Sequence, residues 1–374
     1  MRVLSSFREL APHWSLVDVG DNPTLSPEWL GALESSGCVD AERGWIPHHL
    51  AVFDGDDLVA AMPGYIKLNS EGEFIFDHQI ARAASRFGVR YFPKLLFAVP
   101  FTPATGPRIV FAKGVDAASA RSTEIVRAVM AKLLEDLPVS SLHVLFLREI
   151  EAARLASPSL LHRASLQFHW RNRGFGTFED FLGTLPSKRR TAIRRERRAL
   201  VDQRITLENL REEQLSPAVA DVTYELYLTT VDKFMWGRRY LNRAFFEEVL
   251  GTMKRSLDLV WAREAGAERP VAAAFNLRSP TTLYGRYWGA FREVPFLHFN
   301  VCYYHSIEQC ILEGRETFEP GAGGEHKLAR GFEPTLTHSL HAFEDERLHA
   351  SVADFFERER ALLEAEIESE RSRS

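Results

Sequence analysis

The sequence predicts a mixed α/β (α+β) protein in which two similar units follow one another along the chain. Helix-like and strand-like segments alternate, and the order of elements in the first half recurs in the second, although no residue-level repeat is visible. At 374 residues the chain is long for a single hydrophobic core, so two domains are the default expectation. We expect an N-terminal domain over residues 1–170 and a C-terminal domain over residues 171–374.

The first half combines helices with an early antiparallel hairpin. Its turn, residues 54–57 (Asp-Gly-Asp-Asp), is a strong hairpin signal, and Pro63 places an edge or a bulge in the second strand. Apolar residues at helical spacing predict a helix over residues 117–137. The other elements expected here are a helix at 27–33, strands at 49–53, 58–68 and 74–78, a helix at 80–87, and strands at 142–147 and 167–170.

The second half opens with a capping box at residues 177–180 and a strongly basic helix over residues 188–198. Seven of those eleven residues are Lys or Arg and Glu196 is the one acid, so the helix is expected to be basic on all sides. The further elements expected are strands at 205–207, 257–263, 270–277, 282–288 and 335–343, helices at 218–228, 245–253 and 300–313 (the last capped by Asn300), and a charged C-terminal helix from residue 344.

The composition bounds the possible functions. It is 45% hydrophobic and 26% charged, which is ordinary for a soluble globular protein, and the net charge of −5 gives the molecule no overall attraction to polyanions. The three cysteines are odd in number and widely spaced, which favours a reducing, cytoplasmic location over a disulfide framework. Because the sequence has no CxxC or HExxH motif, no secretory signal and no long apolar run, we expect no metal site and no membrane span. The oligomeric state stays open.

The most informative stretch is a glycine-rich loop at residues 320–324 (Pro-Gly-Ala-Gly-Gly), which is followed directly by Glu325, His326 and Lys327. Glycines let the backbone approach a ligand closely, and the N–H groups of residues such as Gly323 and Gly324 can hold an anion or an oxyanion. Charged side chains directly after such a loop are well placed to act on what it holds. A surface loop with solvated charges is an equally good interpretation of the spacing.

The strand and helix before that loop supply further candidates for substrate binding. Strand alternation places Tyr284, Arg286 and Trp288 on one face and Tyr287 on the other. An arginine on an aromatic face can bind an anionic group or stack on a ring. His298, at the entry to the following helix, is also a candidate, with a packed histidine as the alternative.

A proline-rich region of the first half carries aromatic and polar residues between apolar segments. Loops of this kind often line binding sites, so Tyr91, Lys94, Phe101 and Thr105 are candidate substrate-binding residues, with a rigid turn of packed aromatics as an equal alternative. Asp77 is a candidate to accept the proton of an attacking amine, as are His326 and Glu325.

Phosphate is the natural partner of the basic helix. The candidate phosphate-binding or RNA-binding residues are Lys188, Arg189, Arg190, Arg194 and Arg195. The alternative is a solvated helix that pairs with acidic stretches of the same chain.

Four stretches carry a resemblance to a known family: the proline-rich run at 95–108, Phe-His-Trp-Arg-Asn-Arg-Gly at 168–174, the basic run at 188–197, and Gly-Ala-Gly-Gly-Glu-His-Lys-Leu-Ala-Arg-Gly-Phe at 321–332. Over most of its length the chain resembles the FemAB-like, peptidoglycan-biosynthesis-related N-acyltransferases of the GNAT superfamily. The resemblance implies a tandem pair of GNAT-like acyltransferase domains with mixed sheets, the first on the acceptor side. In better-known members the donor is an aminoacyl-tRNA, and a lysine near the end of the second domain steadies the reacting carbonyl. Lys327 matches that lysine.

The expected function is therefore that of an N-acyltransferase, which forms an amide by direct transfer of an acyl or aminoacyl group to the amine of a small molecule or peptide. No permanently bound cofactor is expected. The co-substrate is aminoacyl-tRNA, which the basic helix favours slightly, or alternatively an acyl-CoA thioester. Residues 171–176 reproduce the R-x-x-G-x-G pattern that holds the coenzyme A pyrophosphate in GNAT enzymes, but they fall at the junction of the two halves. A third possibility is a non-catalytic binder of cell-wall precursor-type ligands.

Overall fold

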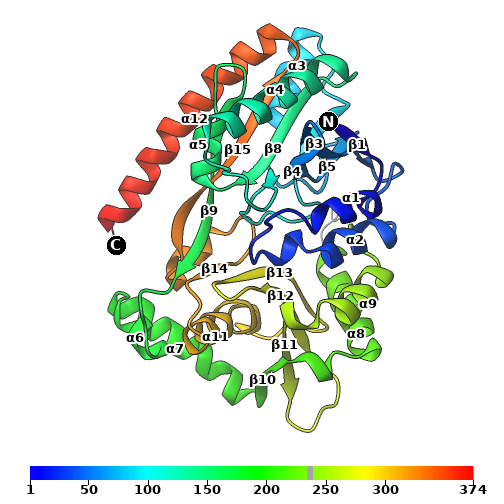
Figure 1. Ribbon diagram of the computed structural model, residues 1–374. Coiled ribbons are helices and arrows are strands. Elements are labelled where there is room, and N and C mark those ends of the chain that lie inside the picture. The colour runs from blue at the N-terminus through cyan, green and yellow to red at the C-terminus, as the bar shows by residue number, and fades with distance from the viewer. Residues whose placement is uncertain (234–238, 374) are drawn as a thin grey trace. The chain divides into compact units, whose positions relative to one another are not determined.

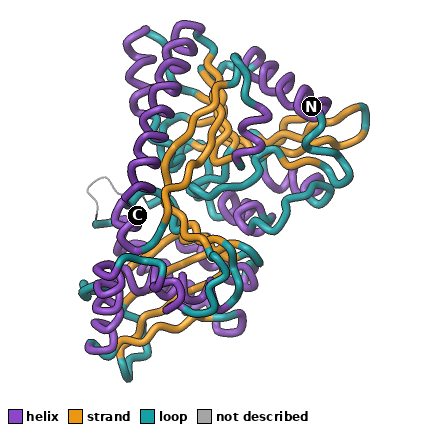
Figure 2. The backbone as a smooth tube through the Cα atoms, turned by 90° about the vertical axis from the view of Figure 1, so that its left-hand side faces the viewer, coloured by secondary structure: helices purple, strands orange, loops and turns teal. Residues whose placement is uncertain are grey.

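The computed structural model describes residues 1–233 and 239–373 and divides into two compact units (Figure 1). Unit 1 contains residues 1–166 and 336–373, and unit 2 contains residues 167–335. Each unit combines strands with flanking helices, as Figure 2 shows by colour. The predicted fold class, mixed α/β with mixed sheets and a C-terminal helix, is confirmed. No helix in the described residues is both long enough and apolar enough to cross a membrane.

Unit 1 contains two sheets. The first sheet has the strand order β1-β3-β4-β7. In the second sheet the neighbouring strands are β15-β8-β6-β5-β2, and β6 and β8 are parallel. The strands are β1 (Arg2–Leu4), β2 (Trp45–Pro47), β3 (His49–Asp54), β4 (Asp57–Met62), β5 (Gly64–Lys67), β6 (Lys94–Phe97), β7 (Val110–Phe111), β8 (Ser141–Leu147), β9 (Leu161–Arg171) and β15 (Glu333–Phe343). The helices are α1 (Phe7–Trp14), α2 (Pro27–Ser35), α3 (His78–Phe87), α4 (Ala120–Asp136), α5 (Glu149–Leu155) and α12 (Glu346–Arg373), with a 3-10 turn at Pro23–Leu25.

The expected hairpin in unit 1 is present, with Asp54 paired with Asp57 across a two-residue turn. The expected second strand is split at Pro63 into β4 and β5, because proline cannot donate a hydrogen bond to a ladder. The strand expected at 74–78 is wrong. Those residues form an irregular segment in which Phe74 and Phe76 have positive φ angles of 61° and 50°, a conformation that extended strands exclude.

The end of the chain groups with unit 1, whereas the sequence analysis assigned it to the second domain. The chain leaves unit 1 within β9 and returns within β15, which pairs antiparallel with β8. Helix α12 then buries Leu348, Val352 and Phe356 in a cluster with Ile80 of α3. Sequence periodicity shows that a segment is a strand or an amphipathic helix, but it does not show which earlier element will cover its apolar side.

Unit 2 is built on one sheet with the strand order β10-β11-β12-β13-β14, and β14 pairs in turn with the end of β9. The strands are β10 (Ile205–Leu210), β11 (Leu257–Glu264), β12 (Ala272–Arg278), β13 (Thr282–Ala290) and β14 (Thr317–Glu319). The helices are α6 (Phe178–Gly183), α7 (Ser187–Asp202), α8 (Pro217–Val231), α9 (Arg243–Thr252), α10 (Leu297–Phe299) and α11 (His305–Leu312), with 3-10 turns at Glu212–Gln214, Lys254–Ser256 and Glu325–Arg330.

Helices cover both faces of the unit 2 sheet. The ring of Phe275 packs on Phe246 of α9, whereas its neighbour Ala274 joins the cluster that contains Leu200 of α7 and Val301. Successive residues of a strand point to opposite faces, so α9 and α7 lie on opposite sides. The helix predicted at 300–313 begins at Leu297, and a π-helical segment at Asn300–Tyr304 joins α10 to α11. The predicted cap role of Asn300 is wrong, because Asn300 is buried inside this continuous helix.

Two local features open space in the unit 2 sheet. Strands β13 and β14 are parallel and paired only from Thr282 to Tyr284 of β13, because β14 stops at Glu319 before Pro320. On the other side of β13, Asn276 of β12 pairs with Gly285 and Phe275 pairs with Tyr287. Residue 286 is therefore the extra residue of a β-bulge, a feature that locally bends a strand and redirects its side chains.

Candidate active site

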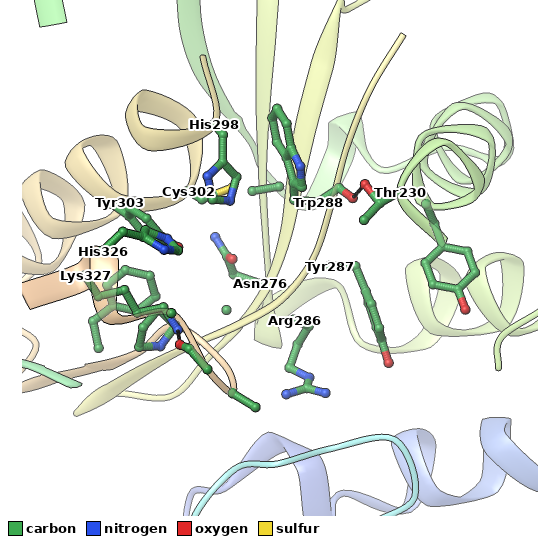
Figure 3. Close-up of a pocket in the computed structure, with 18 of the residues that line it drawn as sticks. Thr230, Asn276, Arg286, Tyr287, Trp288, His298, Cys302, Tyr303, His326 and Lys327 are labelled. Atoms are coloured by element: carbon green, nitrogen blue, oxygen red, sulfur yellow. Dashed lines mark hydrogen bonds between the residues drawn. The ribbon is translucent and has the colours of Figure 1, made fainter. Parts of the chain in front are cut away.

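A cavity of about 320 Å³ lies in unit 2 where β13 continues beyond the end of β14. Figure 3 shows His326 and Lys327 on one side, Tyr287 and Trp288 on the opposite side, and Asn276 between them. All of its lining residues belong to unit 2. They come from α8 (Tyr227, Thr230, Val231), β12 and β13 (Ala274, Asn276, Gly285, Arg286, Tyr287, Trp288), the helix 297–312 (His298, Cys302, Tyr303) and residues 318–327 (Phe318, Pro320, Ala322, Gly323, Gly324, His326, Lys327).

Strand β13 contributes three consecutive side chains to the cavity, beginning at the bulged residue 286. Arg286, Tyr287 and Trp288 all line it. As alternation predicted, Tyr287 and Trp288 lie on opposite faces of the sheet, because the Tyr287 ring packs on Phe246 of α9 whereas Trp288 packs against the cluster that contains Leu200 of α7. Tyr284, also a predicted site residue, is buried and does not line the cavity. The Trp288 ring lies 5.0 Å from that of His298, so the aromatic wall continues from the strand to the helix.

Lys327 lies in the 3-10 helix Glu325–Arg330, between Gly324 and Gly331, which both have positive φ angles. Only 3% of Lys327 is exposed, and its Nζ donates hydrogen bonds to the carbonyl oxygens of Gly321 at 2.8 Å and Gly323 at 2.5 Å. Burial lowers the pKa of Lys327 to about 8, so the side chain is still mainly an ammonium at neutral pH. The glycine loop thus binds the ammonium through its carbonyl groups.

This pKa predicts how stability depends on pH. Between pH 8 and the ordinary lysine pKa of 10.5, the unfolded chain keeps the Lys327 proton and the folded chain has lost it. The free energy of unfolding therefore rises with pH in that window, by up to about 1.4 kcal/mol per pH unit from this group. Urea unfolding of wild type and Lys327→Met at several pH values isolates the effect as the difference between the two proteins. A difference that stays constant across the window would contradict a buried ammonium.

Two histidines line the cavity and are neutral at pH 7. Burial, with smaller contributions from His326, Lys327 and Arg330, lowers the pKa of His298 to about 4. Burial and the adjacent Lys327 and Arg330 charges also lower the pKa of His326, whose Nε2 lies 3.0 Å from the hydroxyl of Tyr303. A neutral imidazole can accept a proton, so His326, the more exposed of the two, can serve as a base, whereas the low pKa of His298 makes it a weak one. Burial raises the pKa of Cys302, which makes it a poor nucleophile.

Asn276 is a cavity residue that the sequence analysis missed. It is 2% exposed, and its Nδ2 donates to Oδ2 of Asp258 at 3.2 Å, which fixes the amide plane. Asp258 also accepts hydrogen bonds from Asn209 and Arg211. The sequence did contain a signal for this residue, because Asn276 is the one polar residue in the apolar run Ala272–Leu277. A buried amide needs specific hydrogen-bond partners, so an asparagine in such a run indicates a specific role.

The remaining predicted site residues lie elsewhere. Glu325 is exposed and does not line the cavity. Asp77, Tyr91, Lys94, Phe101 and Thr105 belong to unit 1.

In unit 1, Lys94 donates to Asp77 at 2.5 Å and to Glu73 at 2.7 Å, and the Tyr91 hydroxyl donates to Asp77 at 2.6 Å. Burial alone would raise the pKa of Asp77, but the Lys94 charge and these hydrogen bonds lower it overall. Asp77 is therefore a weak base in this buried cluster. Phe101 is buried with a positive φ angle of 55°, and Thr105 accepts a hydrogen bond from Asn22 through its carbonyl group.

Residues 171–176 form no open phosphate cradle. The Asn172 side chain accepts from the N–H groups of Gly174 and Phe175, and Arg171 donates to Thr317 at 2.6 Å. The following helix is closed by a reciprocal capping box between Thr177 and Asp180. The N–H groups of Gly174, Phe175 and Thr177 at this turn already have side-chain partners within the protein.

The predicted basic helix is α7, and three of its candidate phosphate-binding arginines instead make contacts with other residues of unit 2. Arg189 donates to the Leu328 carbonyl at 3.3 Å, Arg190 to the Leu185 carbonyl at 2.7 Å, and Arg194 pairs with Glu179 at 2.6 Å. Lys188, Arg195 and Arg198 are exposed. Their spacing places them on one side of the helix, where they form an exposed row of cations, named here the basic stripe.

Comparisons with known proteins agree with this architecture. The model of the FemAB-like family, described as peptidoglycan biosynthesis/recognition, matches residues 7–374, which confirms the resemblance inferred from the sequence motifs. No curated protein matches the sequence.

Among solved structures, FemX superposes with a TM-score of 0.53 at 10% identity, over 94% of this chain and 100% of that one. The C-terminal domain of a putative lysylphosphatidylglycerol synthetase from Agrobacterium fabrum gives 0.55 at 11% identity, over 93% and 96%. A Bacteroides thetaiotaomicron protein of unknown function gives 0.53 at 12% identity, over 92% and 99%. At such low identity these likenesses establish a shared fold.

Proposed function

The chain belongs to the FemAB-like family of peptidoglycan biosynthesis and recognition proteins, and from this premise we propose that it is an acyltransferase that forms an amide by direct transfer of an acyl or aminoacyl group to an amine. The observation that carries the proposal is the buried ammonium of Lys327 in the wall of the unit 2 cavity. A lysine ammonium has three N–H donors, and two of them bind the carbonyl groups of Gly321 and Gly323. The third is left for a substrate oxygen.

In the proposed reaction the amine nitrogen attacks the carbonyl carbon of an ester or thioester in the cavity. The C–N bond forms, the carbonyl oxygen becomes an oxyanion, and the Lys327 ammonium stabilises that charge where little water competes. Neutral His326 accepts the proton that the amine nitrogen loses. The tetrahedral intermediate then expels the alcohol or thiol, which takes a proton from His326 as the C–O or C–S bond breaks. Direct attack needs no covalent enzyme intermediate.

Aminoacyl-tRNA is the favoured donor. A pyrophosphate-bearing thioester is usually held by a glycine-rich turn at a helix N-terminus. The turn between β13 and α10 is Phe291-Arg-Glu-Val-Pro-Phe296, which has no glycine and whose proline lacks an N–H. The basic stripe on α7 instead offers exposed cations for the phosphates of an RNA.

The basic stripe gives a quantitative prediction. The double variant Lys188→Gln/Arg195→Gln should bind tRNA more weakly, and its slope of log affinity against log salt should become shallower by about 2, because two phosphate contacts are lost. Arg255→Gln is the matched control, since Arg255 is an exposed cation of unit 2 on another element. Titration of fluorescent tRNA at several salt concentrations measures both quantities. An unchanged slope in the double variant would remove the stripe from the proposal.

The function itself is tested by product formation. Purified protein is incubated with an acceptor amine, including a peptidoglycan-precursor peptide, and with either a mixture of aminoacyl-tRNAs or a panel of acyl-CoA thioesters. Mass spectrometry should detect an amide product with aminoacyl-tRNA, and RNase treatment should abolish it. A product made only from thioesters, and insensitive to RNase, would assign the alternative donor. Ligand binding without product from any donor would indicate a non-catalytic binder. Tyr91, Lys94, Phe101 and Thr105 of unit 1 stay predicted substrate-binding residues in this proposal.

A further inference from the structure

Glu196, the one acid in the basic run of α7, is buried beneath the charged surface of that helix. It is 7% exposed, and both of its carboxylate oxygens lie 3.2 Å from Nη2 of Arg330. The Tyr304 hydroxyl donates a further short hydrogen bond to the same carboxylate. A buried carboxylate is costly to keep without partners, so this ion pair holds together three segments that are distant in the sequence.

Arg330 carries the interaction to the helix that presents Lys327. Its Nη1 donates to the carbonyl oxygen of His326 at 2.9 Å, and its guanidinium lies 3.3 Å from the centre of the Phe299 ring. Its Nε finds no hydrogen-bond partner among the described residues. The position of Arg330 is therefore set mainly by Glu196 and by the Phe299 ring, and Arg330 in turn fixes the backbone next to Lys327.

Two other contacts tie α7 to the same region. The amide of Asn300 donates to the Glu196 carbonyl at 2.9 Å, and Arg189 donates to the Leu328 carbonyl at 3.3 Å. Helix α7 therefore contacts the Lys327 helix at two points about two turns apart, through Arg189 and through Glu196. The exposed side of the same helix carries the basic stripe.

We propose that Glu196 is a positioning residue, which through Arg330 holds the Lys327 helix so that the ammonium and the His326 ring face the cavity. This inference deepens the proposed function and rests on it for its effect on catalysis. The structural part of the inference is that the Glu196 carboxylate fixes the surroundings of Lys327, and this part does not depend on which acyl donor the protein uses.

The test compares Glu196→Gln with Glu179→Gln. Both remove a carboxylate that pairs with an arginine, but Glu179 pairs with Arg194 at the exposed surface of α7. Glu196→Gln should lower kcat roughly 100-fold, the loss expected from misplacing a catalytic group by about 1 Å, with little change in KM. Glu179→Gln should leave kcat unchanged.

A second readout needs no substrate. Competitive labelling of lysines with acetic anhydride at several pH values reports the pKa of Lys327 by mass spectrometry. In wild type it should lie near 8. In Glu196→Gln it should rise toward the ordinary lysine value, because a released Lys327 helix is less buried. Unchanged titration together with unchanged kcat would overturn the proposal. If wild type makes no product from any donor, the proposed function fails, and this labelling result alone decides the positioning role.

The double variant Glu196→Gln/Arg330→Gln separates positioning from stability. Removing one member of a buried ion pair leaves an uncompensated charge, and removing both relieves that cost. The double variant should therefore regain thermal stability relative to either single variant while kcat stays low. Recovery of kcat together with stability would show that Glu196 acts only by stabilising the fold.

Discussion

Lys327→Met is expected to lower the kcat of amide formation by about 100- to 1,000-fold, the usual effect of removing one donor to a developing oxyanion. Methionine has a length similar to that of lysine and no charge, so the cavity keeps its size and loses the ammonium. The loss should fall on kcat more than on KM, because the interaction strengthens as the carbonyl oxygen gains charge in the transition state. Steady-state kinetics with saturating donor measure both parameters.

Lys132→Met is the matched control for this variant. Lys132 lies on α4 in unit 1, its side chain is 62% exposed, and it pairs with Asp136 one turn away. The control should keep wild-type kcat and KM, since surface ion pairs of this kind contribute little. Wild-type activity in Lys327→Met would mean that the ammonium takes no part in the chemistry.

Gly289→Ala is expected to destabilise unit 2 by about 3 kcal/mol or more, at the upper end of the cost of overpacking a core. A Cβ atom on Gly289 would overlap the main-chain carbonyl of Leu226 in α8 and would lie 2.8 Å from the Thr229 hydroxyl. Backbone cannot rotate away as a flexible side chain can. Hydrogen bonds from Thr230 to the Trp288 carbonyl and from the Ala290 N–H to Thr229 hold α8 against β13 at this point. Separation of the two elements would also widen the cavity that both line.

Gly251→Ala is the control for that substitution. Gly251 lies within α9, and a Cβ atom there meets nothing within 4 Å. Alanine favours a helix over glycine by about 1 kcal/mol, so this variant should be as stable as wild type or slightly more stable. Urea unfolding followed by tryptophan fluorescence compares the two variants. Equal stability of Gly289→Ala and wild type would contradict the close contact of α8 with β13.

Local sequence rules predicted much of this fold and part of the site. The two-residue hairpin turn at Asp54–Asp57, the capping box at Thr177 and the basic helix α7 are set by residues within a few positions of one another. The glycine loop was also recognisable from its own residues. His326 and Lys327, which follow it directly, line the cavity together with Arg286, Trp288 and His298.

The features that the sequence did not reveal depend on contacts between distant segments. The bulge at residue 286 follows from the register between β12 and β13, which no single strand determines. Glu196 looked like an exception within a basic helix, because its partner Arg330 lies 134 residues further along the chain. The buried cluster of Lys94 and Asp77 depends likewise on the irregular segment before α3, where alternation predicted a strand.

The central claim is that a protonated Lys327 neutralises the reacting carbonyl oxygen. Its most direct test is the pH dependence of kcat/KM, from about pH 6 to about pH 10, for wild type and for Lys327→Arg, whose guanidinium stays protonated throughout. The same acceptor amine serves both proteins, so its own titration cancels in their ratio. We predict that the ratio of wild type to Lys327→Arg falls as the pH passes through about 8, where Lys327 loses its proton. A ratio that rises through that pH would mean that the neutral amine acts as a base, and would contradict the account.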